Sequence, residues 1–175
     1  MSLINLLPQT IKEELRRKSL LKVISGLNNF DLHSVKTIVD AAALGGADLV
    51  DIACNPELVE LALKNSSLPV CVSSVVPHSF LDSVKAGASL IEIGNYDTFY
   101  EKGINFSDEK VFNITKETRD LLPNVPLSVT VPHTMPNYKQ VDLAIKLVEE
   151  SVDIIQTEGG TSVRPYSSGI LGFFE

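Results

Sequence analysis

Residues 20–31, with the sequence LLKVISGLNNFD, decide the fold that the chain is expected to adopt. The run begins as a short buried strand, turns at Ser25 and Gly26, and ends at Asp31, which can cap a following helix. The same succession of apolar strand, turn and amphipathic helix recurs along the rest of the chain. This repetition predicts parallel strands that are joined by crossover helices.

Turn residues and apolar runs set the expected limits of each element. Capping-box patterns from Thr10 to Glu13 and from Asn137 to Gln140 predict the starts of the first and last helices. Other helices are expected to begin near residues 31, 56, 77 and 107, where a capping residue or proline occurs. Strands are expected over residues 20–25, 48–53, 69–74, 89–94, 127–131 and 152–157.

Composition indicates one globular α/β domain, with residues 1–19 forming a helix ahead of a unit that spans residues 20–175. The chain has 175 residues, 44% of them hydrophobic, and a net charge of −7, which argues against nucleic acid or a membrane surface as a partner. The basic run Arg16-Arg17-Lys18 is interpreted as a solvated helix face. The two cysteines, Cys54 and Cys71, are too few for a disulfide framework.

The expected strands fall into two groups that alternate along the chain. The second, fourth and sixth strands share the patterns ADLVDIA, ASLIEIG and VDIIQTE, whereas the others carry a small hydroxyl residue near the carboxyl end. In a closed barrel, side chains of one interior layer come from alternate strands. The alternation therefore predicts two interior levels: one with Asp51, Glu92 and Gln156, and another with Ser25, Ser73 and Thr130.

Six expected strands are too few for a complete barrel, which usually needs eight strands and about 200 residues or more. We therefore predict a partial (β/α)8 barrel with six of the eight parallel strands, in which residues 167–175 begin the next helix. The two outer strands are expected to leave apolar surface at an open side, near Val23, Ile24, Ile154, Ile155, Phe173 and Phe174. Such a surface favours a weakly stable chain or a homo-oligomer.

Six runs of the sequence carry a family resemblance: KVISGLNNFD, GADLVDIA, PVCVSSV, IEIGNYD, LSVTVPH and DIIQTEGG. Over residues 22–169 the chain resembles the family called hypothetical chloroplast reading frame twenty-three, which occurs in algal plastid genomes and cyanobacteria. The resemblance implies a barrel of the ribulose-phosphate-binding type. It also implies a location in the plastid stroma or the cyanobacterial cytoplasm, and members that run longer than this chain.

Polar residues at the carboxyl ends of the strands are the candidate functional groups, because barrel chemistry takes place at that end. We predict Asp51, Glu92 and His133 as catalytic residues. Two carboxylates held close together raise the pKa of one of them and can exchange a proton with a substrate. The alternative is a polar layer that is satisfied internally. Other residues expected at this rim are Ser25, Asn28, Ser73, Asn95, Thr130, Gln156 and Glu158.

Two histidines extend the set of candidates. His78 and His133 follow the third and fifth strands, and with Asp51 and Glu92 they offer the ligand types of a metal-dependent epimerase. Their offsets from the preceding strands differ, so we assign no metal ion, and the sequence identifies no cofactor.

Lys22 and Cys54 suggest nucleophiles, but the pattern argues against both. If Ser25 points inward, Val23 does too, and Lys22 then faces the helices. A Schiff-base lysine, as in class I aldolases, is therefore the minor interpretation. Cys54 is interpreted as a buried small residue.

The segment after the sixth strand is the best candidate for binding an anion. Its glycines, hydroxyl and guanidinium can surround a phosphate or carboxylate, although a plain loop is an equal alternative. The residues are Gly159, Gly160, Thr161 and Arg164. The aromatic connection over residues 95–106 is interpreted either as a lid over the rim or as a packed loop.

These features together predict a protein that binds, and transforms by acid/base chemistry, a small anionic, phosphorylated metabolite. The alternatives are a non-catalytic ligand-binding or regulatory protein and an inactive truncated fragment.

Overall fold

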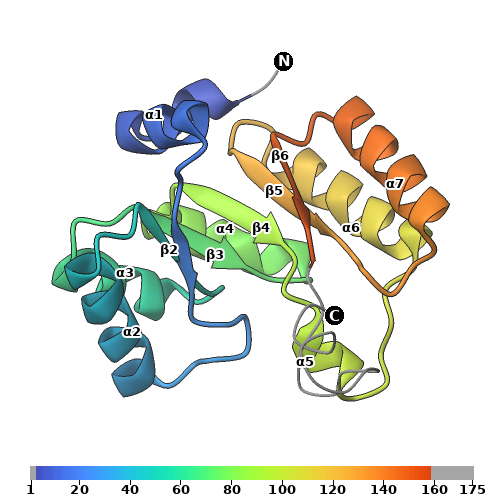
Figure 1. The fold of residues 1–175 in the computed structure, drawn as a ribbon. Helices are drawn as coiled ribbons and strands as arrows, with labels where there is room; N and C mark the ends of the chain where they lie inside the picture. The colour runs from blue at the N-terminus through green and yellow to red at the C-terminus, as the bar shows by residue number, and fades with distance from the viewer. Residues whose placement is uncertain (1–2, 159–175) are drawn as a thin grey trace, which may run out of the picture.

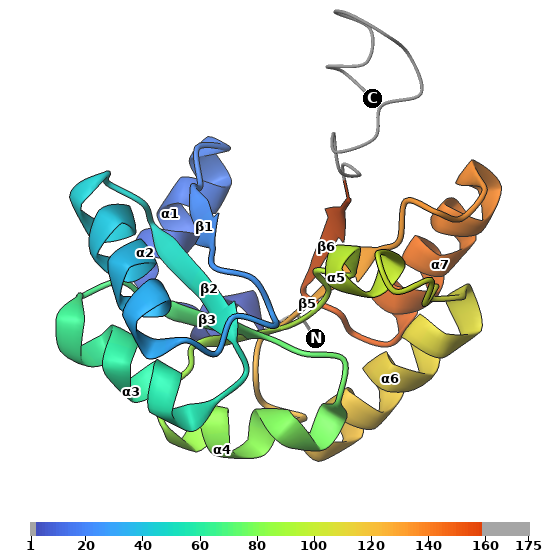
Figure 2. The same ribbon diagram turned by 90° about the horizontal axis from the view of Figure 1, so that it is seen from below.

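The computed structural model describes residues 3–158, in which six parallel strands form one sheet in the order β1-β2-β3-β4-β5-β6. Figure 2 shows that the sheet curls into an open arc with the helices around its outer side. The strands are β1 (Lys22–Ile24), β2 (Leu49–Ala53), β3 (Val70–Ser73), β4 (Leu90–Ile93), β5 (Leu127–Val131) and β6 (Ile154–Thr157).

The helices alternate with the strands (Figure 1), which confirms the predicted strand order and the partial (β/α)8 barrel. They are α1 (Gln9–Arg17), α2 (Leu32–Leu44), α3 (Pro56–Asn65), α4 (Phe80–Lys85), α5 (Asp97–Tyr100), α6 (Asp108–Leu121) and α7 (Asn137–Glu149). Short 3-10 turns, η1 (Ile4–Leu6) and η2 (Pro77–Ser79), precede α1 and α4.

The main core lies between the convex face of the sheet and the helices. Ile52 and Ile93 belong to it, and both are fully buried, as expected if Asp51 and Glu92 point to the opposite, inner face. Alternating side chains thus separate an apolar layer outside the sheet from a polar layer inside it.

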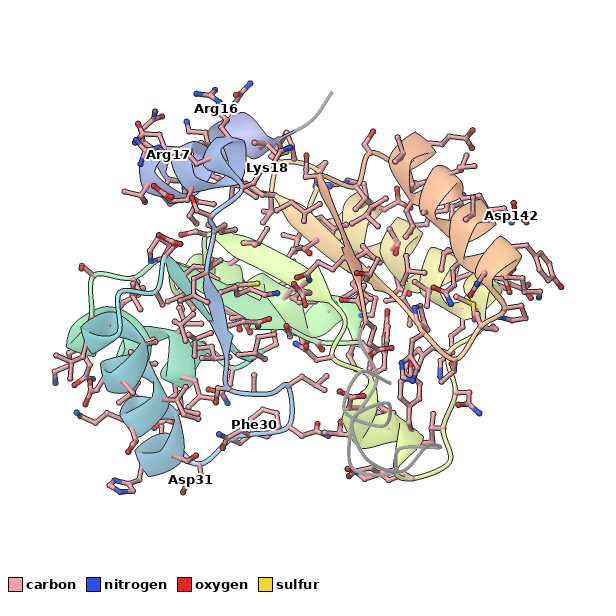
Figure 3. The ribbon with its side chains drawn as sticks, viewed as in Figure 1. Arg16, Arg17, Lys18, Phe30, Asp31 and Asp142 are labelled. Carbon is pink, nitrogen blue, oxygen red and sulfur yellow. The ribbon has the colours of Figure 1, made fainter. Side chains whose placement is uncertain are left out.

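The amino-terminal end of the barrel is closed by α1. Leu7 and Ile11 are buried against Leu49, Cys71 and Leu90, the inward residues at the starts of their strands. Figure 3 shows Arg16, Arg17 and Lys18 at this end of the molecule and Phe30 and Asp31 at the other. The basic run is therefore remote from the carboxyl rim.

Helix caps agree with the sequence at several positions and differ at two. Asp31 accepts a hydrogen bond from the Ser34 amide at 2.7 Å, and Asn55 and Ser107 also cap their helices. The predicted capping boxes at Thr10 and Asn137 are wrong. In both places the helix begins after a proline whose fixed φ already suits the helix entrance.

Replacing Asp31 with alanine is expected to lower the free energy of unfolding by about 0.5–2 kcal/mol, because the Ser34 amide loses its partner. Chemical denaturation of both chains measures this change. Asp142→Ala, at an exposed position of α7, is the matched control and should change stability by less than about 0.5 kcal/mol. Equal effects of the two substitutions would contradict the capping role.

Apolar surface is exposed near the open side, as expected. Ile24 is 47% exposed, and Val23, Ile154 and Ile155 are half-buried. Phe173 and Phe174 lie outside the described residues. A further apolar stripe runs along α7, where four exposed side chains recur at helical spacing: Tyr138, Val141, Ile145 and Val148. Among residues 3–158, no helix has the length and hydropathy that crossing a membrane requires.

Candidate functional site

The register between β1 and β2 decides which side chains enter the barrel. Ile24 pairs with Asp51 and Lys22 with Leu49, so Lys22 and Ile24 lie on the same face as Asp51. The same rule places Ser73, Glu92 and Gln156 on the inner face of their strands.

Lys22 lies between the two predicted catalytic acids. Its Nζ is 3.2 Å from Asp51 Oδ2 and 2.5 Å from Glu92 Oε2, and its side chain is only 13% exposed. Asp51 and Glu92 are 0% and 1% exposed, so the ion pairs lie almost entirely out of water. Gln156 Nε2 also donates to Glu92 Oε2. The predicted level of Asp51, Glu92 and Gln156 is therefore present, with Lys22 added to it.

Ser73 and Asn95 hold Asp51 from the carboxyl side. Ser73 Oγ donates to Asp51 Oδ1 at 2.6 Å, and Asn95 Nδ2 donates to Ser73 Oγ at 3.0 Å and to Asp51 Oδ2 at 3.3 Å. Asn95 has a φ of +60°, a left-handed conformation that costs energy for a residue other than glycine. This strained turn aims the amide back into the barrel directly after β4.

Glu92 Oε1 is buried and accepts no hydrogen bond of normal geometry within residues 3–158, although the hydroxyl of Ser128, its neighbour on β5, lowers the pKa of the carboxyl group. Gly94 follows on the same face. A methyl group there would lie 2.3 Å from Thr130 Oγ1 and 3.1 Å from Glu92 Oε1. The absence of a side chain at Gly94 thus lets the Thr130 side chain approach the carboxyl side of Glu92 closely.

Burial and neighbouring charges shift the pKa values of Glu92 and Lys22. Burial raises the pKa of Glu92, and the Asp51 charge raises it further, while Lys22 acts in the opposite direction. Burial alone would lower the pKa of Lys22, but the attraction of the Glu92 and Asp51 carboxylates raises it above its usual value. Glu92 is therefore a carboxyl group that takes up a proton readily, beside a lysine that keeps its charge.

The prediction that Lys22 faces the helices is wrong. It assumed that Ser25 belongs to the inner face, but β1 ends at Ile24 and the chain turns at Gly26, where φ is +98°. The raised pKa keeps Lys22 an ammonium ion, and an ammonium ion is not a nucleophile. The Schiff-base interpretation remains the minor one for this electrostatic reason.

Ser25 and Asn28 lie away from the network. Ser25 follows the inward-facing Ile24 and so points to the other face, which makes its predicted level with Ser73 and Thr130 wrong. Its Oγ accepts a hydrogen bond from Asn29 Nδ2 at 2.9 Å. Asn28 instead donates to Thr98 of α5 at 2.9 Å, which ties the loop after β1 to the loop after β4.

A second polar cluster lies at the rim beyond β5 and β6. Glu158 Oε2 is 2.8 Å from His133 Nδ1 and accepts hydrogen bonds from the His133 amide at 3.1 Å and the Tyr100 hydroxyl at 2.9 Å. The rings of Tyr100 and His133 meet edge to face, with centroids 5.2 Å apart. His133 therefore joins Glu158 rather than Asp51 and Glu92.

The two-histidine, two-carboxylate metal site is not assembled. His78 is an exposed residue whose Nδ1 is 3.4 Å from Glu117 Oε1 of α6, on the outer side of the sheet. Asp51, Cys71 and Glu92 do offer ligand atoms within 4.8 Å of one another. Lys22 already bridges the two carboxylates of this set, so a metal ion would compete with its ammonium group.

The aromatic connection packs down as a loop. Tyr96 is fully buried, stacks on Phe106 at 4.5 Å and donates its hydroxyl to the Thr130 carbonyl. Cys54 is held by Ser79 and Ser83, and burial raises the pKa of its thiol, which fits a structural role. The predicted anion-binding residues Gly159, Gly160, Thr161 and Arg164 lie outside the described residues.

Sequence reasoning missed two participants. Lys22 was visible as a lysine in an apolar strand, but its inward direction depends on strand register. Tyr100 was grouped with the aromatic connection, and nothing in the sequence indicated that its hydroxyl reaches a carboxylate 58 positions later.

The sequence over residues 6–175 matches the family model described as "Protein of unknown function (DUF561)". The chain belongs to the DUF561 family. Its relatives include uncharacterized ycf23 proteins from Cyanophora paradoxa, 51% identical over 83% of this chain, and from Porphyra purpurea, 40% identical over 94%. The chain spans 60% and 62% of the length of these two relatives.

Solved structures support the fold of this DUF561 member. The aldolase QR15 aligns with a TM-score of 0.58 at 19% identity, covering 85% of this chain and 69% of that one. A 2,3-dimethylmalate lyase of the PEP mutase/isocitrate lyase superfamily aligns with a TM-score of 0.57 at 13% identity, covering 87% and 64%. At such identities the likeness concerns the barrel fold alone.

Proposed function

We propose that the protein binds a small anionic metabolite at the carboxyl end of the barrel and moves a proton on it by acid/base chemistry. The observation that carries this proposal is the Lys22 ammonium group between two buried carboxylates, one of which, Glu92, has an oxygen that accepts no hydrogen bond of normal geometry from the described residues. Burying three ionisable groups is costly for stability, and such clusters are found preferentially at functional sites.

Each member of the network has a role in this proposal. Glu92 takes a proton from a carbon next to a carbonyl group and later returns it, which its raised pKa favours. Lys22 has three N–H donors and uses two on the carboxylates, so the third can stabilise negative charge on the carbonyl oxygen. Asp51, held by Ser73 and Asn95, positions Lys22.

A phosphorylated ligand is the finer form of the proposal. The aldolase likeness fits it loosely, and the glycine-rich residues after β6 are the proposed phosphate contact. The family resemblance and the algal relatives support a plastid stroma as its location. A homo-oligomer is proposed as well, because β1 and β6 each pair on one side only within residues 3–158.

Solvent deuterium exchange tests the acid/base chemistry even when the product of the reaction has not been identified. The chain, and a chimera extended with the carboxyl-terminal part of the Cyanophora paradoxa relative, are incubated with a metabolite extract in D₂O. Mass spectrometry should find a metabolite that gains deuterium. Glu92→Gln should slow this gain by about 10²–10⁴-fold, because the proton acceptor is lost.

Glu60→Gln, at an exposed position of α3, is the matched control and should exchange at the wild-type rate. Deuterium uptake that Glu92→Gln leaves unchanged would refute the role of Glu92. A metabolite that binds to the chimera and gains no deuterium would favour the non-catalytic binding protein.

A further inference from the structure

His133, Glu158 and Tyr100 form a unit whose hydrogen bonds determine the state of the imidazole ring. A carboxylate oxygen can only accept, and Glu158 Oε2 faces the His133 ring nitrogen Nδ1 at 2.8 Å. Nδ1 must therefore carry the hydrogen, which leaves Nε2 with a free electron pair in the neutral ring. The Tyr100 hydroxyl, 2.9 Å from the same oxygen, holds Glu158 from the other side.

His133 is positioned to use this nitrogen. Its side chain is 34% exposed, and Nε2 makes no hydrogen bond to any residue of the described part of the chain. The edge-to-face contact with Tyr100 fixes the plane of the ring. A histidine with Nδ1 on a carboxylate and Nε2 free has the arrangement of a general base with its orienting group.

The unit lies one interior level above the lysine network. Gln156 lies in β6 and contacts Glu92, and Glu158 comes two residues later, directly after the strand. Side chains two residues apart along a strand point to the same face and lie roughly 7 Å apart, so Glu158 also faces inward. Glu158 Oε1 and Asp97 Oδ1 are buried at this level without partners among residues 3–158, and the Glu158 side chain is only 8% exposed. Burial and the Glu158 charge raise the pKa of Asp97, which places this carboxyl group close to Glu158.

We propose that His133 is a second acid/base group that acts through Nε2 on the same ligand as Glu92, with Glu158 and Tyr100 as positioning residues. This inference rests on the proposed function and adds a substrate class, α-hydroxycarbonyl compounds. Glu92 takes the C–H proton, which leaves an enediolate whose negative charge Lys22 stabilises. The neutral His133 ring then takes the proton of the other hydroxyl group at Nε2 and delivers it to the former carbonyl oxygen. Return of the proton from Glu92 to the neighbouring carbon completes an isomerisation without any co-reactant.

Imidazole ¹⁵N NMR of the whole chain tests the positioning role, independently of turnover. At pH 9 the wild-type ring should show its hydrogen on Nδ1. Glu158→Leu should lose this preference, whereas Glu149→Gln, an exposed control on α7, should keep it. The exposed His78 serves as an internal reference. A wild-type ring with its hydrogen on Nε2 would overturn the inference.

Kinetics separate this inference from the proposed function. With an α-hydroxycarbonyl substrate, His133→Gln should slow isomer formation by about 10²–10⁴-fold, while deuterium still exchanges at the C–H position through Glu92. If His133→Gln forms the isomer at the wild-type rate and exchanges deuterium normally, the role of His133 is overturned and the proposed role of Glu92 stands. Absence of exchange in every chain would overturn both proposals.

Discussion

Replacing Lys22 with methionine is expected to lower the free energy of unfolding by about 3–5 kcal/mol at pH 8. The substitution keeps most of the side-chain volume and removes the charge between Asp51 and Glu92. Two carboxylates that are 0% and 1% exposed would then face each other without a cation. The loss should be smaller at pH 5, where a proton on Glu92 relieves the repulsion. Urea unfolding at both pH values measures it.

Two further chains make this result specific. Lys64→Met, at an exposed position of α3, should change stability by less than about 0.5 kcal/mol. Adding Asp51→Asn and Glu92→Gln to Lys22→Met should restore part of the loss, because the buried charges are removed together. A Lys22→Met chain as stable as the wild type at both pH values would show that the lysine does not bridge the acids.

Stability of the wild type should fall as the pH rises from 4.5, the usual value for a glutamate, through the raised pKa of Glu92. In this range the folded chain binds a proton that the unfolded chain has released, so raising the pH favours unfolding. One such group contributes a slope of at most about 1.4 kcal/mol per pH unit. Glu92→Gln should remove this part of the slope and be the more stable chain near neutral pH.

The measurement is a series of urea unfolding curves between pH 4 and 8 for both chains. Glu60→Gln should keep the wild-type slope, because Glu60 is exposed on α3. Lys22 contributes in a different range: its pKa is raised from 10.5, so its stabilisation is present below that pH and is lost as the pH rises above it. An unchanged slope in Glu92→Gln would mean that Glu92 stays ionised over the whole range.

The order of the elements was predictable because it follows from local patterns. Each strand is an apolar run closed by a turn, and each helix starts at a residue such as Asp31 or Asn55 whose side chain caps it. The inward direction of Asp51 and Glu92 was also predictable. Side chains alternate between the two faces of a strand, and interior layers of a barrel come from alternate strands, so no distant contact needs to be known.

The partners within the site depended on tertiary structure. Lys22 and Glu92 are separated by 70 positions in the sequence, and His133 and Glu158 by 25. Neither contact can therefore be recognised from a local sequence pattern. The direction of Lys22 depends on one step of register between β1 and β2, and a one-residue shift moves every side chain to the other face. Local sequence patterns specify which elements form and in what order they pair. Only the packed sheet decided which charges meet inside it, because a buried charge must find its partner among the residues that the fold brings near.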